Sequence, residues 1–216
     1  MQVDIELRLE QKRVYEWLDQ ELNLPVFAEA YKGAVILLQL KSAGYISFIA
    51  HAGRDLMNTL PSTVQQIQSK RVQYQQHVDS LQKCWKDEWQ SNDELFSKGV
   101  TQGHFIPIPI CKKISNLINE HKSARTRSSE ADGLFFSTFL DYSDKNKIPN
   151  NFLSEWKSAK KWFLAHAHLR SKPFEQKVVN DLVTHFTCLD GYLYIAASSQ
   201  HERLKVLNEI LDTTNQ

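Results

Sequence analysis

Histidine and cysteine, the residue types that most often carry metal or acid–base chemistry, are scattered along this chain rather than grouped. The chain has 8 His and 3 Cys. His166 and His168 are two residues apart, which places them about 200° apart on a helix, so they cannot hold one ion together. Cys84, Cys111 and Cys188 are far apart and odd in number, which favours reduced thiols over a disulfide framework. Gly-rich phosphate loops and strand–turn–helix nucleophile motifs are missing from the sequence, so we expect no metal and no cofactor.

One pair of polar residues has the spacing of a known catalytic signature. Arg71 is followed by Val-Gln-Tyr-Gln-Gln and then by His77. An Arg followed by a His after four to six residues resembles the signature of HEPN domains, which are all-helical proteins of prokaryotic toxin–antitoxin and antiviral systems. In that family, Arg and His from two protomers meet at a dimer interface and cut RNA without a metal. The resemblance implies that His77 is the base for the ribose 2′-hydroxyl and that Arg71 is the cation holding the phosphate.

The alternative for this pair is two exposed residues on a polar helix. Val72 stands where the family has a second polar residue beside the Arg. A step of six residues along a helix rises about 9 Å and turns about 240°, so Arg71 and His77 of one chain point to different faces. The sequence leaves both interpretations open.

Two longer segments are similar to helical proteins of bacterial defence loci. They are IAHAGRDLMNTLP, which begins at Ile49, and LDGYLYIAASSQHERLKVLNEILDTTN, which begins at Leu189. This likeness extends loosely over roughly half of the chain. From it we expect a non-catalytic helical subunit of a bacterial defence or regulatory complex, which binds a larger protein partner. A HEPN-like, metal-independent ribonuclease is the second hypothesis.

A basic cluster in the middle of the chain supports a third hypothesis, a nucleic-acid-binding accessory protein. Local basic density of this kind is what phosphate binding needs. An RNA- or DNA-binding sequence motif does not accompany it, so a solvated basic face is the alternative. Only Glu120 opposes the members of the cluster, which are Lys112, Lys113, Lys122, Arg125 and Arg127.

The composition excludes several classes of protein. Hydrophobic residues make up 42% of the 216, which fits a globular chain and not a mainly disordered one. The net charge of +1 gives no global attraction to nucleic acid or to anionic lipid. The first residues alternate in charge and do not resemble a signal peptide, and the apolar run 34–52 is too polar for a membrane span. We therefore expect a cytoplasmic protein without a membrane segment.

The most apolar stretch, 34–60, predicts a buried helix on which the other helices pack, and a break at Gly33 or Gly44 is the alternative. Its polar residues recur at steps of three or four, and His51 and Arg54 lie on that line with Asp55. The line is either a strip exposed to solvent or an interface with a partner. Because its neighbours are apolar, we expect Arg54 to be tied to a buried acceptor, and Asp55 is poorly placed for that role. Pro61 is expected to end this helix.

A long polar helix over 62–90 is expected next, beginning with a capping box at Ser62. Its apolar stripe is narrow, as in a helix that lies at the surface or pairs with another chain. Aromatic residues are favoured at interfaces, so we expect another chain or a second copy to cover Tyr74, Trp85 and Trp89.

The pattern as a whole predicts an all-α fold, a single bundle of seven or eight helices over residues 1–216. Only 7 Gly and 6 Pro punctuate the chain, which favours long helices over many short strands. The polar run 123–130 is the best candidate for a loop and a subdivision. Another capping box at Ser199 predicts that a separate helix begins there.

Overall fold

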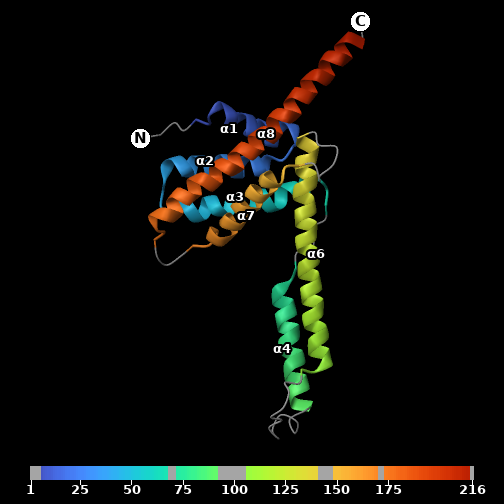
Figure 1. Cartoon of the computed structure of the whole chain (residues 1–216). Helices are drawn as coiled ribbons and strands as arrows, with labels where there is room; N and C mark the ends of the chain where they lie inside the picture. The colour runs from blue at the N-terminus through green and yellow to red at the C-terminus, as the bar shows by residue number, and fades with distance from the viewer. Residues whose placement is uncertain (1–5, 68–71, 92–105, 141–147, 170–172, 215–216) are drawn as a thin grey trace. The chain divides into compact units, whose positions relative to one another are not determined.

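The predicted all-α fold is confirmed (Figure 1). Within the described residues, the regular elements are seven α-helices and one π-helical turn, with no strand. The contacts divide the chain into two compact units. We call Met1–Ile67 with Glu130–Gln216 the core unit, and Gln68–Ser129 the hairpin unit. The computed structural model describes residues 6–67, 72–91, 106–140, 148–169 and 173–214, and all of their side chains except those of 89–91 and 207–214.

The core unit begins with three short helical elements. Helix α1 (Leu9–Glu16) runs directly into the π-helical turn η1 (Trp17–Glu21), and helix α2 covers Pro25–Leu40. Asn23 adopts a left-handed conformation with φ 54° and separates η1 from α2. Pro25 occupies the first turn of α2, where its missing N–H costs nothing.

The apolar stretch 34–60 forms two helices, and the break lies at Gly44, one of the two glycines at which an interruption is the alternative to a single helix. Lys41 ends α2 in a left-handed conformation, and Gly44, with φ 77°, precedes helix α3 (Tyr45–Val64). Glycine adopts this positive φ without steric cost, so the chain reverses at Gly44. Helix α3 packs against α2, against α7 (Asn150–His166) and against α8 (Gln176–Thr214). The stretch is therefore central, and its second helix, α3, is the one that contacts α2, α7 and α8.

The predicted end of this helix at Pro61 is wrong. Pro61 lies inside α3, which continues for a further turn. The hydroxyl of Ser62 donates to the carbonyl oxygen of Thr59 at 2.9 Å, so Ser62 is a helical residue and not the cap of a new helix. Residues 65–67 follow as a turn, and the next helix starts at Tyr74. The long helix expected over 62–90 is thus two elements.

Aromatic side chains fill the centre of the core unit. Phe136 makes edge-on contacts with Trp156 and Phe152, with ring centroids 4.9 and 4.8 Å apart. Trp17 contacts Phe139 in the same way at 5.1 Å. Edge-to-face pairs of this kind stabilise a fold beyond the area they bury. They join η1, α7 and the last turns of helix α6 (Ile108–Phe139).

Two of the predicted helix boundaries do not exist. The polar run 123–130 is an uninterrupted part of α6, and Ser199 lies inside α8, which runs without a break from Gln176 to Thr214. Neither site contains Gly or Pro, and Ala, Arg, Gln and Glu within them are good helix formers. Polar residues at these sites indicate exposure to solvent. Exposure does not require the chain to reverse, so the helices continue through them.

The described part of the hairpin unit is a pair of helices. Helix α4 (Tyr74–Ser91) lies beside the first turns of α6 (Figure 1). In the described part of this unit, the buried apolar side chains are those of Pro107 and Ile110. The pair therefore has only a thin core of its own.

Candidate functional site

The two helices of the hairpin unit are antiparallel and are joined by polar side chains. Tyr74 Oη lies 2.6 Å from His121 Nδ1, at the start of α4. One turn further along α4, His77 Nε2 lies 3.0 Å from Glu120 Oε2. The Lys113 ammonium donates to the hydroxyl of Ser80 at 2.7 Å. As the residue number rises on α4 it falls on α6, which is the antiparallel arrangement.

An inward row of residues with heptad spacing lies between the helices. Steps of four and three residues keep such a row on one face, as in a coiled coil. Its members are partly or wholly covered: His77, Leu81, Cys84 and Glu88 on α4, and Ile110, Lys113, Leu117 and Ala124 on α6.

A second row of apolar residues lies beside the first and is exposed. Val78 and Trp85 on α4 are 52% and 46% exposed, and Ile114 and Ile118 on α6 are 37% and 46% exposed. Tyr74, also on α4, is 49% exposed. Successive members on α4 are four and then seven residues apart, and the two on α6 are four apart, so the members on each helix lie along one face of it. We call these five residues the hairpin face.

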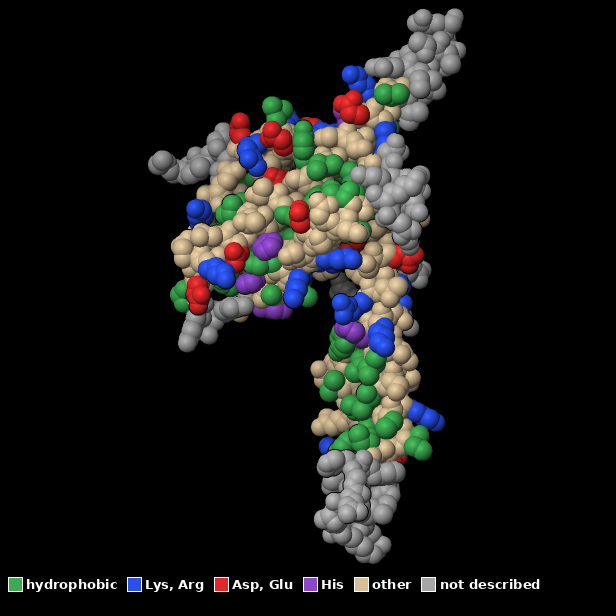
Figure 2. Space-filling view, viewed as in Figure 1, with side chains coloured by type: hydrophobic (Ala, Val, Ile, Leu, Met, Phe, Trp, Pro, Cys, Tyr) green, Lys and Arg blue, Asp and Glu red, His purple; other side chains and the backbone are tan. Residues whose placement is uncertain are grey.

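The hairpin-face residues of α4 and those of α6 lie on the same side of the helix pair. At 100° per residue, the exposed row of α4 is rotated about 70° from its inward row, and that of α6 about 90° in the same sense. In an antiparallel pair, equal senses of rotation turn both rows to one side. Figure 2 shows hydrophobic side chains gathered over α4 and α6. The result is one apolar surface to which both helices contribute.

The five basic residues predicted to bind nucleic acid do not form one patch. Lys122 and Arg125 lie beside Ile118 on the side of the hairpin face, whereas Lys112 and Arg127 point to other sides of α6. Lys113 is engaged with Ser80 between the helices. These residues are close in sequence, but they lie on different sides of α6 because each step along a helix turns by about 100°.

The predicted catalytic pair is only half described. Arg71 lies outside the described residues. His77 is partly covered and paired with Glu120. If His77 Nε2 carries the proton, it donates to the carboxylate and leaves Nδ1 as a basic nitrogen. The side chain of Trp89, the third residue predicted at an interface, also lies outside the described part.

The acceptor of Arg54 is not buried, which corrects the expectation for the central helix. Arg54 Nε donates to Asp55 Oδ1 at 3.0 Å, and the terminal nitrogen of Arg54 lies 3.2 Å from His51 Nε2. The side chains of His51 and Asp55 are about half exposed, at 55% and 49%. Neighbouring positions on a helix rarely face each other, but the long guanidinium arm of Arg54 folds back far enough to reach Asp55. His51, Arg54 and Asp55 form a local surface cluster.

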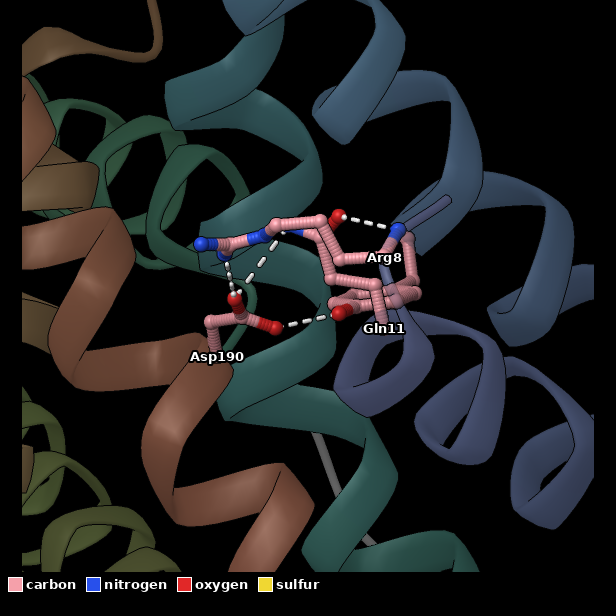
Figure 3. Close-up of polar contacts among 4 residues, drawn as sticks. Arg8, Gln11 and Asp190 are labelled. Carbon is pink, nitrogen blue, oxygen red and sulfur yellow. Dashed lines mark hydrogen bonds and ion pairs between the residues drawn. The ribbon is translucent and has the colours of Figure 1, made fainter. Parts of the chain in front are cut away.

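A buried carboxylate, which the sequence analysis missed, ties the N-terminal helices to α8. Asp190 accepts hydrogen bonds from Arg8 at 3.2 Å and from Gln11 at 3.3 Å, and the Tyr31 hydroxyl donates to its other oxygen. Figure 3 shows Arg8 and Gln11 pointing toward the Asp190 carboxylate. Burial of the phenol and the adjacent Asp190 charge raise the pKa of Tyr31. The sequence contains a signal for this site, which is an acidic residue, Asp190, next to Leu189 and three residues before Leu193 on an apolar helix face.

A second buried pair joins α6 to α7. Lys160 Nζ lies 3.1 and 3.2 Å from the two oxygens of Asp132. Burial raises the pKa of Asp132, and the nearby ammonium of Lys160 works against that rise. Asp132 and Asp190 both have polar partners, so both fit a structural role.

A groove of about 470 Å³ runs between α1 and α8, but its charged side chains suit no single ligand. Glu10 and Glu202 line it together with Arg13. Arg13 is already engaged, because it donates to the Ala197 carbonyl oxygen at 2.9 Å and pairs with Glu21. The hairpin face therefore remains the candidate site.

In the part of the chain that the structure describes, three or more His, Cys, Asp or Glu side chains do not come together as metal ligands. Within that part, the helices lack an apolar segment of the length that crosses a bilayer.

Comparisons of the chain with protein-family models, with curated proteins and with solved structures find no match. The candidate site consequently stands on the geometry of the chain itself.

Proposed function

We propose that the protein is a non-catalytic helical binding protein and that the hairpin face binds a protein partner. The observation that carries the proposal is the exposure of Val78, Trp85, Ile114 and Ile118 on one side of a helix pair with little core of its own. Fully burying an aliphatic or aromatic side chain is worth about 1.5–3 kcal/mol, so covering several of them supplies a large share of a stable association. Exposed apolar surface of this kind marks interaction sites.

The setting that we propose is a bacterial defence or regulatory complex with a larger subunit. It rests on the resemblance of the segments beginning at Ile49 and Leu189 to helical proteins of defence loci. The hairpin face supports the binding role and is independent of the setting.

The test compares two matched charge substitutions in a complex purified from native cells. Ile118→Asp places a charge in the hairpin face, and Val183→Asp places one at a site on α8 that is 48% exposed, close to the 46% of Ile118. We expect wild type and Val183→Asp to elute with a partner of defined mass and Ile118→Asp to elute alone. Circular dichroism checks that all three are equally helical. Retention of the partner by Ile118→Asp would contradict the proposal.

The pairing of His77 with Glu120 favours a second candidate, a HEPN-like metal-independent ribonuclease. A carboxylate that holds a histidine in one orientation is a common feature of general bases. If this candidate is right, the purified protein cuts RNA in the presence of EDTA, and His77→Ala abolishes the cleavage while His201→Ala does not. Equal cleavage by wild type and His77→Ala would remove His77 from consideration.

A further inference from the structure

We infer that the occupant of the hairpin face is an amphipathic α-helix with acidic flanks. This inference rests on the proposed function and adds the chemical class of the partner. It follows from the shape of the apolar surface and from the charges at its edges.

The shape of the hairpin face suits one helix lying along two others. Tyr74 and Trp85 are eleven residue steps apart, which is about 16 Å along α4 and about three turns of a helix. The exposed apolar residues of α4 and of α6 form two rows that lie side by side, each with coiled-coil spacing. Side chains of a further helix fit between two such rows. A partner helix of about twelve residues covers the whole surface.

The charges at the edges of the hairpin face are mainly positive. Lys122 and Arg125 lie at the end where α4 begins, and Lys86 follows Trp85 near the other end. In the described part of the chain, Lys122 and Arg125 are without a carboxylate partner. The acidic residue at the rim, Asp79, accepts a hydrogen bond from Gln75 at 2.9 Å. A helix that carries Glu or Asp beside its apolar stripe pairs with these cations.

The same charges argue against two copies of this chain meeting through the hairpin face. A symmetric dimer would bring Lys122 and Arg125 of one copy near the basic rim of the other, and like charges at an interface cost binding energy. An acidic helix meets no such repulsion.

The test selects peptides on the intact protein. A displayed library of helices of about 14 residues has fixed Leu at the core positions and Glu, Gln or Lys in equal proportion at the flanking positions. It is selected on wild type, on Ile118→Asp, and on a charge-reversed variant with Lys86→Glu, Lys122→Glu and Arg125→Glu. We expect wild type to enrich Glu at the flanks, the charge-reversed variant to enrich Lys, and Ile118→Asp to enrich neither.

A measured affinity supports the selection. The best Glu-flanked peptide, labelled with fluorescein, is titrated against each variant by fluorescence anisotropy. We expect binding about tenfold weaker or more for the charge-reversed variant, and weaker for wild type as salt is raised. Circular dichroism confirms that each variant keeps its helix content.

Four outcomes would overturn the inference. Equal recovery of Glu- and Lys-flanked helices by wild type means that the rim does not select charge. Recovery of no helix, while the native complex still depends on Ile118, means that the occupant is not a helix, and the proposed function survives. An Ile118-dependent dimer in light scattering identifies a second copy as the occupant. Ile118-dependent binding to vesicles of phosphatidylserine and phosphatidylcholine, without peptide binding, identifies a membrane surface.

Discussion

Asp190 shows how one buried carboxylate can organise distant parts of a chain. It is 8% exposed and binds groups from the start of α1 and from α2, more than 150 residues away in sequence. A charge at such a site is tolerated because each of its oxygens has a hydrogen-bond donor. Removing one donor should therefore reveal part of the cost of burying the carboxylate.

Replacing Tyr31 with Phe removes the donor to one Asp190 oxygen and changes little else in shape. We expect the free energy of unfolding to fall by about 1–3 kcal/mol, the usual cost of leaving a buried acceptor unsatisfied. Urea denaturation followed by circular dichroism measures the change. Tyr15→Phe is the matched control, because Tyr15 donates to Glu29 at an exposed site and should change stability by less than about 0.5 kcal/mol. A loss of the same size in both variants would show that Asp190 is not specially dependent on Tyr31.

His185 gives the core unit a pH dependence with a defined sign. Burial beside Trp162 lowers its pKa from the ordinary 6.5; His166 lowers it further and Asp181 opposes the fall. In the unfolded chain the imidazole takes up a proton near pH 6.5, whereas the folded chain resists protonation to lower pH. Stability is therefore complete above about pH 6.5 and is lost as the pH falls below that value.

Melting temperatures at about pH 7.5, 6.5 and 5.5 check this expectation. His185→Gln should flatten the loss of stability on acidification, and His201→Gln, at an exposed position, should leave the loss as in wild type. An unchanged pH profile for His185→Gln would assign the acid sensitivity to other groups.

At the scale of elements, α3 is held to α7 by an approach that only glycine permits. A Cβ added at Gly53 would lie 2.8 Å from the ring of Phe163, which is fully buried. Real Cβ atoms do not come so close to a ring carbon, and the surrounding core leaves Phe163 little freedom to move. The contact fixes how near the two helix axes lie.

Gly53→Ala should therefore lower the free energy of unfolding by about 1–3 kcal/mol, as overpacked core substitutions do. Gly33→Ala is the matched control, because a Cβ there meets nothing within 4 Å. It should raise stability by about 0.5–1 kcal/mol, since Ala is a better residue than Gly inside a helix. Chemical denaturation of both variants gives the comparison. A stabilised Gly53→Ala would mean that α3 and α7 can separate at no cost.

The helices could be predicted from their apolar spacing, but their boundaries depended on contacts that local patterns do not contain. Ser62 and Ser199 each have the sequence of a helix start and lie inside helices, because a capping box is used only where the chain turns. The prediction for Arg54 is wrong for a related reason, because spacing along the backbone does not include the reach of its long side chain to Asp55. The hairpin face could be predicted in part: Tyr74 and Trp85 stand out in α4, whereas Ile114 and Ile118 become its members only through the antiparallel pairing.

At the scale of the whole molecule, the hydrophobic core formed by the described residues lies in one of the two units. Its buried members come from 14–60 and from 135–197, all within the core unit. Gln65, at the end of α3, donates to the Thr138 hydroxyl of α6 at 3.1 Å, so the chain leaves the core unit and returns to it at nearby places.

Residues 68–129 should therefore be removable without loss of the core. Joining Ile67 to Glu130 through about eight Gly and Ser residues spans about 16 Å, whereas Glu130 is about 12 Å along α6 from Thr138. We expect the shortened protein to be helical and to melt cooperatively, and to lose binding of the partner. Calorimetry measures the melt. A shortened chain without a cooperative transition would show that the core unit needs the hairpin unit to fold.

The placement of the tryptophans allows intrinsic fluorescence to report on binding and on unfolding separately. Trp17 and Trp156 are fully buried, whereas Trp85 on the hairpin face is 46% exposed. Iodide, a charged collisional quencher, reaches exposed indoles and not buried ones. The difference in quenching between wild type and Trp85→Phe therefore isolates the emission of one surface residue. Shielding of that component by a bound chain would report docking in solution without an attached dye, while the buried indoles report unfolding by a shift of their emission to longer wavelength.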